Sequence, residues 1–174
     1  MCGRIAVTLP SDSMAKLFAA LPANNLPSVP NYNICPTDTV HVVRSRGEGR
    51  ALVAMRWGFV PQWYKTPNNG PLLINARAET IAQKPAFREA CRTRRCLLPV
   101  TGFYEWERGS DKPLPWFVQR ADKTPLVMAG IWQKWEKDGE ELVTCAIVTT
   151  AANTAMGRIH HRIPVILTPD AWAL

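Results

Sequence analysis

Apolar and polar residues alternate over much of the chain, and this period of two predicts strands rather than helices. The runs TVHVVRS and RALVAMRWGF, residues 39–45 and 50–59, are expected to pair as a hairpin across Gly47 and Gly49. Further strands are expected at residues 95–107, 115–121, 126–136, 141–150 and 163–168. The segments between these runs carry Gly, Ser, Asp and Lys, which suit tight turns.

Helical periodicity is confined to three segments, at residues 11–21, 84–94 and 150–159. Ser11 is expected to cap the first helix, whose apolar stripe comprises Met14, Leu17, Phe18 and Leu21. Thr150 is the expected cap of the third helix and Gly157 its expected end. Many strands with few helices indicate an α+β fold, a largely antiparallel, barrel-like β-sheet with a few packed helices.

The length suits one domain with its own core, so residues 1–174 are expected to form a single domain. Thr168 and Pro169 have the chemistry of a helix start, and this C-terminal helix is expected to be incomplete. No stretch has the layout of a signal peptide or enough apolar residues to span a bilayer. Five cysteines, an odd number without a CxxC pair, are typical of a reducing compartment and argue against structural zinc. We therefore expect a cytoplasmic protein, monomeric by default.

The net charge of +7 and the pI of about 9.5 favour an anionic partner, most simply nucleic acid. The alternative is a basic protein whose charge serves only solubility. The composition does not distinguish these two interpretations.

The amino terminus, MCGR, places a cysteine directly after the initiator methionine. Aminopeptidases remove Met1 when the next residue is small, which would leave an α-amine and a thiol together on Cys2. Both groups titrate at about pH 8, so both are partly nucleophilic in cells. Such a 1,2-aminothiol condenses with an aldehyde to an imine and then closes to a thiazolidine. The alternatives are a peptidase or amidase nucleophile, and a small buried residue without a chemical role.

Two strand-like segments carry polar groups suited to a site. In INARAET, Asn75, Arg77 and Glu79 would share one strand face and could hold a phosphate. In FYEWE, Glu105 stands between two aromatic residues and is a candidate general acid. In both cases the alternative is a solvent-facing polar strand face, with the aromatic neighbours of Glu105 in the core.

The segment RIHHRIP carries two of the three histidines. His160 and His161 would face opposite sides of a strand, so at most one is expected to move protons. Adjacent histidines without a flanking carboxylate do not suit one metal ion, and no metal is expected. Among the aromatic residues, Trp57 is expected in the core, whereas Trp63 and Tyr64 are expected to be exposed in a Pro-rich loop, where they could stack on bases.

Taken together and in order, MCGR, YNICPT, MRWGFVPQW, INARAET, FREACRTRRCLLPVTGFYEW and IHHRIPVIL resemble the SOS-response-associated peptidase (SRAP) family of abasic-site processing proteins. The resemblance runs from residue 2 to about residue 168. It implies that Cys2 crosslinks to the ring-opened sugar of an abasic site in single-stranded DNA, without a cofactor. It further implies DNA at junctions of single strand and duplex, and association with the nucleoid while bound.

The resemblance also implies roles for individual residues. The implied catalytic residues are Cys2, Asn75, Glu105 and His160, with Asn75 positioning the amine or sugar, Glu105 assisting ring opening and His160 serving imine formation and reversal. The implied DNA contacts are Arg4, Asn33, Trp63, Tyr64, Arg77 and Arg162, the three arginines at phosphates and the two aromatic residues at bases. The alternatives are an N-terminal-nucleophile cysteine peptidase and a noncatalytic single-stranded DNA-binding module.

Overall fold

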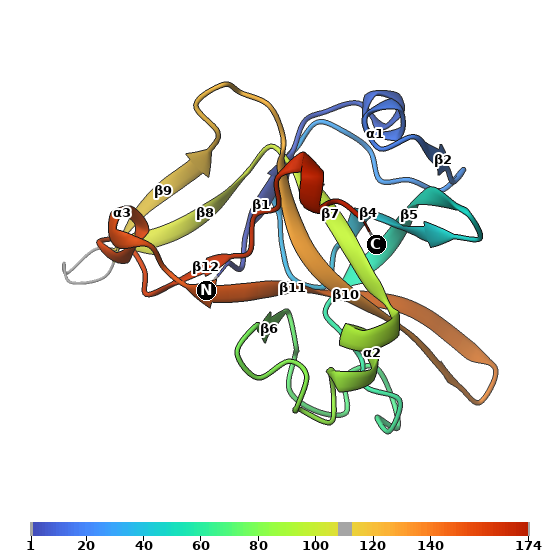
Figure 1. The fold of residues 1–174 in the computed structure, drawn as a ribbon. Coiled ribbons are helices and arrows are strands. Elements are labelled where there is room, and N and C mark those ends of the chain that lie inside the picture. Colours follow the sequence, from blue (N-terminus) through green and yellow to red (C-terminus); the bar gives the residue numbers. More distant parts are fainter. Residues whose placement is uncertain (1, 108–112, 174) are drawn as a thin grey trace.

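The computed structural model describes residues 2–107 and 113–173 (Figure 1). The strands are β1 (Ile5–Val7), β2 (Ala20–Pro22), β3 (Asn31–Ile34), β4 (Thr39–Arg46), β5 (Gly49–Trp57), β6 (Asn75–Arg77), β7 (Arg95–Val100), β8 (Gly102–Glu107), β9 (Leu114–Gln119), β10 (Leu126–Lys137), β11 (Glu140–Ala151) and β12 (Arg162–Pro164). The helices are α1 (Ser11–Leu17), α2 (Arg88–Thr93), α3 (Thr154–Gly157) and the 3₁₀ turn η1 (Pro169–Ala171). The α+β prediction is confirmed.

Five strands close into a barrel in the order β11, β10, β7, β4 and β5, with β5 returning to β11. Four of the five contacts are antiparallel and only the closing contact between β5 and β11 is parallel. Apolar side chains of these strands fill the interior, including Trp57, which is fully buried as predicted. The barrel-like, largely antiparallel prediction is therefore confirmed, as is the hairpin of β4 and β5, whose turn uses Gly47 at a φ of 58°.

A second sheet stands beside the barrel in the order β3, β1, β8 and β9. The run 95–107, predicted as one strand, is divided at Thr101 into β7 in the barrel and β8 in this second sheet. The Thr101 backbone N–H donates to the carbonyl oxygen of Ala6, 2.8 Å away. The chain thus changes partners at this residue, and the second sheet carries the amino-terminal strand β1 alongside β8.

The first helix is shorter than predicted and is capped differently. It ends at Leu17, and Leu17 and Leu21 are exposed, whereas Met14 and Phe18 are buried. The predicted Ser11 cap is wrong, because Ser11 is already the first helical residue and its Oγ lies 3.1 Å from Nε2 of His41.

The third helix begins later than predicted. Thr150 lies within β11, and the side chain of Asn153 caps α3 by accepting a hydrogen bond from the Met156 N–H at 2.9 Å. Gly157 ends the helix as predicted.

Near the carboxyl terminus, Thr168 makes no side-chain capping hydrogen bond and Pro169 opens only the 3₁₀ turn η1. The prediction that Met1 is removed concerns a residue outside the described ranges.

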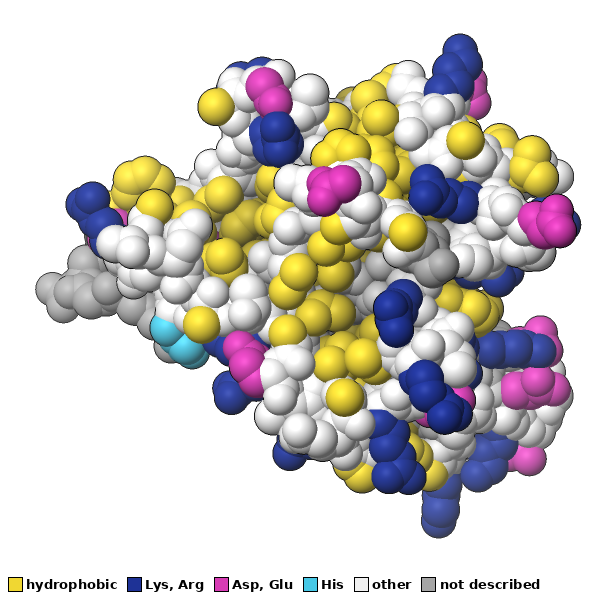
Figure 2. Space-filling view, viewed as in Figure 1, with side chains coloured by type: hydrophobic (Ala, Val, Ile, Leu, Met, Phe, Trp, Pro, Cys, Tyr) yellow, Lys and Arg dark blue, Asp and Glu magenta, His cyan; other side chains and the backbone are white. Residues whose placement is uncertain are grey.

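Apolar side chains form a band down the middle of the face in Figure 2, while Lys and Arg side chains are spread around its edges, most densely at the lower right. The positive charge is thus distributed over this face rather than gathered in one place. Within the described ranges, no helix is long and apolar enough to cross a membrane.

Candidate active site

Four segments that are distant in sequence meet beside β1. Cys2 precedes β1, Asn75 opens β6, Glu105 lies in β8, and His160 lies in the segment before β12. β1 pairs with β8, while β6 and β12 both pair with β11, so the two sheets deliver these side chains to one place. The Tyr104 N–H donates to the Arg4 carbonyl oxygen at 2.9 Å, which carries the pairing of β1 and β8 toward Cys2.

Cys2 is held through its own backbone. The Nδ2 of Asn75 donates to the carbonyl oxygen of Cys2 at 2.9 Å, and the Cys2 side chain is fully buried. Oδ1 of Asn75 is also buried and accepts no hydrogen bond from the described residues. An amide that fixes the terminal backbone and keeps an acceptor available suits the predicted positioning role of Asn75.

The Glu105 carboxyl group connects Cys2 with His160 electrostatically. Burial, reinforced by the nearby charge of Glu105, raises the pKa of the Cys2 thiol to about 12. Burial lowers the pKa of His160 from its usual value, while the charge of Glu105 opposes that shift. Glu105 is only 4% exposed, whereas its neighbour Trp106 is 37% exposed. The alternative that placed Glu105 on the wet face is therefore wrong.

The His160 ring is oriented by the backbone two residues further on. The Arg162 N–H donates to Nδ1 of His160 at 3.0 Å, so the neutral ring carries its proton on Nε2. The Arg162 carbonyl oxygen lies 3.2 Å from the same nitrogen and can accept a hydrogen bond from it when the ring is charged. Both protonation states therefore find a partner, as a proton-transferring histidine requires.

The two adjacent histidines do not face opposite sides of a strand. Both precede β12, and the rings of His160 and His161 stack with centroids 4.4 Å apart. Only His160 is buried. The prediction of opposite faces is wrong because it assumed extended strand geometry at this position.

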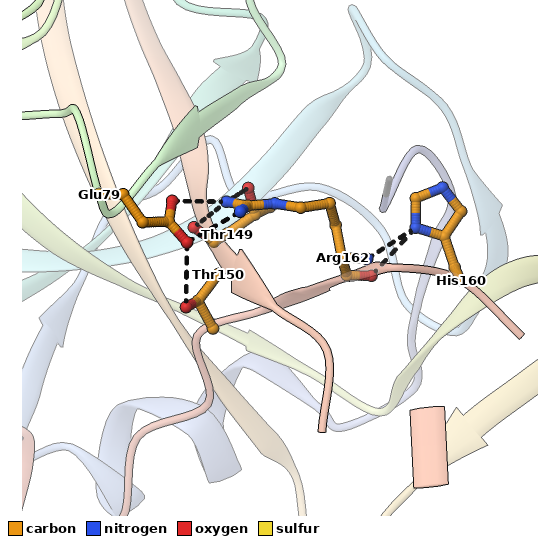
Figure 3. Close-up of polar contacts among 5 residues, drawn as sticks. All are labelled: Glu79, Thr149, Thr150, His160 and Arg162. Carbon is orange, nitrogen blue, oxygen red and sulfur yellow. Dashed lines mark hydrogen bonds and ion pairs between the residues drawn. The ribbon is translucent and has the colours of Figure 1, made fainter. Parts of the chain in front are cut away.

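Arg162, expected at a phosphate, is 8% exposed and bound within the protein. Its guanidinium donates to both carboxylate oxygens of Glu79, at 2.8 and 3.0 Å, and to the Thr149 carbonyl oxygen at 2.7 Å. Figure 3 shows the side chain extending away from His160 toward Glu79 and Thr149. These bonds tie the start of β12 to Glu79 and to β11. The predicted contact of Arg162 with a phosphate remains a prediction.

β6 ends at Arg77, so the shared face predicted for Asn75, Arg77 and Glu79 does not extend to Glu79, which follows the strand. Arg77 is exposed. Instead of sharing one face, the two side chains have different surroundings. Glu79 accepts hydrogen bonds from Arg162, while Arg77 is exposed to solvent.

The remaining predicted arginine lies near the amino terminus. Nη1 of Arg4 donates to Oδ1 of Asn33 at 2.6 Å, and Asn33 is exposed on β3. The Arg4 guanidinium also lies 6.0 Å from the ring centroid of Trp106. Arg4 and Asn33 therefore form one polar edge beside Cys2.

The two neighbouring aromatic residues of the loop differ. Trp63 is 60% exposed, as predicted, but Tyr64 is only 9% exposed, so its predicted exposure is wrong. The Tyr64 hydroxyl donates to the Pro71 carbonyl oxygen at 3.2 Å, and its own carbonyl accepts from Nε1 of Trp135 at 2.9 Å. Tyr64 anchors the loop and leaves Trp63 as its exposed ring.

Sequence reasoning missed Trp116, which lies directly across from Glu105 in the ladder of β8 and β9. Strand alternation indicates which residues share a face, but only the register shows that this ring faces the same side as Glu105. No group of three or more His, Cys, Asp or Glu side chains within the described ranges is arranged to hold a metal ion.

The family model for SOS response associated peptidase (SRAP) matches residues 1–174. The chain is 36% identical over 98% of its length to abasic site processing protein YoqW of Bacillus subtilis, covering 77% of that protein. It is 34% identical, with the same coverages, to abasic site processing protein YedK of Escherichia coli. The chain is also similar to a solved protein structure from Bacteroides thetaiotaomicron, with a TM-score of 0.87 and 27% sequence identity. The match covers 97% of this chain and 78% of the Bacteroides chain.

Proposed function

The chain belongs to the SRAP family, in which the relatives compared above are named abasic site processing proteins, and from this premise we propose that it captures abasic sites covalently through Cys2. In this proposal Met1 is removed, and the α-amine and thiol of Cys2 react with the ring-opened sugar in single-stranded DNA. The observation that carries the proposal is the convergence of Asn75, Glu105 and His160 on Cys2.

The chemistry balances with the groups at this site. The Glu105 carboxylate takes the proton of the anomeric hydroxyl and gives it to the ring oxygen as the ring opens, and the α-amine bonds to the aldehyde carbon. His160 carries the two protons of the nitrogen to the carbonyl-derived oxygen, the second as the hydroxyl departs, so that water leaves and an imine forms. The sulfur then bonds to the same carbon, and the thiol proton passes by way of the Glu105 carboxylate to the nitrogen. A thiazolidine and one water molecule result.

The state of the thiol argues against the peptidase alternative. A peptidase cysteine attacks as a thiolate, which needs a lowered pKa. Here burial and the Glu105 charge raise the pKa of Cys2 to about 12, so the sulfur is a neutral thiol at cellular pH. In the proposed order the amine attacks first and the thiol reacts only with the imine, so a neutral thiol is no obstacle.

The proposal assigns the DNA contacts to polar and aromatic side chains outside the catalytic set. Arg4 and Asn33 form the polar edge beside Cys2, and Arg77 is exposed at the end of β6. The exposed ring of Trp63 would stack on a base where the single strand meets a duplex. Tyr64 is left out of this interface because its ring is buried.

The test is the intact mass of the denatured protein after incubation with a single-stranded oligonucleotide containing one abasic site. We expect an adduct equal to the two masses less one water, formed only by protein that has lost Met1. Cys2→Ala should lose the adduct. Cys91→Ala, which removes another free thiol, should keep it.

Other results would replace the proposal. Salt-sensitive DNA binding without an adduct would favour the noncatalytic binding module. Peptide turnover that depends on Cys2, again without an adduct, would favour the peptidase. An undiminished adduct in Cys2→Ala, or in protein that retains Met1, would exclude the aminothiol mechanism.

A further inference from the structure

A cavity of about 200 Å³ lies beside the proposed active site, lined by Glu107, Trp116, Ala155, Arg158 and Ile159. One wall comes from β8 and β9 and the other from α3 and the residues that follow it. Figure 1 shows α3 next to the place where β8 ends and β9 begins.

Two independent connections place this cavity next to the catalytic residues. Trp116 pairs with Glu105 across the ladder of β8 and β9, and paired residues point to the same face of a sheet. On the opposite wall, Arg158 precedes the buried His160 by two residues. A strand of DNA held at Cys2 would therefore pass this cavity with an adjoining nucleotide.

Trp116 is exposed but held in place. Its Nε1 donates to Oε2 of Glu107 at 3.0 Å, yet 47% of the residue remains accessible. A fixed, exposed indole loses little conformational entropy when a planar partner stacks on it.

Arg158 supplies the complementary charge. It is exposed, and no carboxylate of the described residues forms a salt bridge with it. An aromatic face next to a guanidinium that pairs with no described carboxylate suits a nucleobase together with its phosphate.

We propose that this cavity is a further DNA subsite, in which the nucleobase adjoining the abasic nucleotide stacks on Trp116 and a neighbouring phosphate binds Arg158. The inference rests on the proposed function, since it takes the lesion to lie at Cys2. It adds a contact for an undamaged base, which would let the protein read the nucleotide beside the lesion.

The test uses a single-stranded oligonucleotide that carries a tetrahydrofuran abasic analogue, which has no aldehyde and cannot crosslink. The fluorescent base 2-aminopurine stands next to the analogue. Wild-type protein should quench its fluorescence on binding. Trp116→Leu should lose this quenching and weaken binding by about tenfold, whereas Trp116→Phe should keep part of both.

Phe117→Leu is the matched control. This neighbouring ring is partly exposed but points to the other face of β9, where it packs on Tyr104 with centroids 4.8 Å apart. It should retain wild-type quenching and affinity. Arg158→Gln should weaken binding and reduce its salt dependence. Melting temperatures of all variants would show that they remain folded.

Unchanged quenching and affinity in Trp116→Leu would overturn the proposal. A second oligonucleotide has the tetrahydrofuran spacer in place of the adjoining base as well. If Trp116→Leu weakened binding to this oligonucleotide as much as to the first, the proposal would also be overturned, because the tryptophan would then act without a base. Since this oligonucleotide cannot react, failure of covalent capture would appear only in the separate adduct assay.

Discussion

The side-chain amide of Asn75 donates a hydrogen bond to the backbone carbonyl oxygen of Cys2 across 2.9 Å, between residues 73 positions apart in sequence. The bond joins the start of β6 to the segment that precedes β1. It restrains the backbone of Cys2 while using neither its backbone nitrogen nor its sulfur. In the proposed function, Asn75 would therefore orient both nucleophiles of Cys2 without occupying either.

Asn75→Asp should slow adduct formation by about tenfold, because a carboxylate keeps the shape of the side chain but cannot donate to the Cys2 carbonyl. Single-turnover crosslinking measures this rate. The melting temperature should fall as well, because the carboxylate places a charge where the buried Oδ1 has no donor among the described residues, so rates are compared well below it. A wild-type rate in Asn75→Asp would show that the tether has no part in the reaction.

His160 should give the crosslinking rate a pH dependence with its midpoint below the ordinary histidine value of 6.5, because burial lowers its pKa. Steps that need the charged ring should accelerate as the pH falls through that midpoint. His160→Gln should be slower and should lack this inflection. Rates measured between about pH 5 and 8 test the prediction, and an unchanged profile in the variant would contradict it.

Glu79→Gln should weaken the pair with Arg162 that holds the start of β12, and should slow crosslinking severalfold. The hydrogen bonds from Arg162 lower the pKa of Glu79 from 4.5 to about 2. The stabilising pair is therefore complete above about pH 4.5 and is lost as the pH falls toward 2. Glu89→Gln is the control, because its pair with Arg92 lies on the surface. Equal effects of the two variants on rate and melting temperature would argue against a special role for Glu79.

Trp63→Ala and Tyr64→Ala should affect different properties, although the residues are adjacent: the first DNA binding and the second stability. Trp63→Ala should change the free energy of unfolding by no more than about 0.5 kcal/mol and weaken binding to single-stranded DNA by about tenfold. Tyr64→Ala removes a buried ring and should destabilise the protein by about 2–4 kcal/mol. Urea unfolding and DNA titration measure the two quantities. Equal stability losses would mean that the loop does not use Tyr64 as its anchor.

His41 should make the protein less stable in mild acid. Burial lowers its pKa from 6.5 to about 4, so the unfolded chain binds a proton in this range and the folded chain does not. The free energy of unfolding should therefore fall as the pH drops from 6.5 to about 4, with a slope of up to about 1.4 kcal/mol per pH unit. His41→Gln should flatten this part of the stability curve. A curve that keeps its slope would assign the effect to other groups.

Much of the secondary structure follows from local pattern, and the exceptions have tertiary causes. The hairpin of β4 and β5 is predictable because both its alternation and its glycine turn are local. The division of 95–107 at Thr101 is not, since both halves have the same period of two. It follows from the pairing of β1 with β8, and the hydrogen bond from Thr101 to Ala6 marks the place.

The chemical groups of the candidate site were visible in the sequence, but their surroundings were not. Alternation in FYEWE allows Glu105 to face either way, and pairing of β8 with β1 places it inside. Likewise, nothing local separates Tyr64 from Trp63. Hydrogen bonds with Pro71 and Trp135, on distant segments, bury one ring and leave the other exposed.

The sequence by itself determined that a cysteine follows Met1, which candidate catalytic and DNA-binding groups the motifs carry, and that strands dominate. Those properties depend on residue type and short-range spacing. Only the tertiary structure decided that Asn75 tethers Cys2, that Arg162 is paired with Glu79, and that Trp116 stands across from Glu105. Burial, register and pairing are set by contacts between residues far apart in the chain, and no local pattern encodes those contacts.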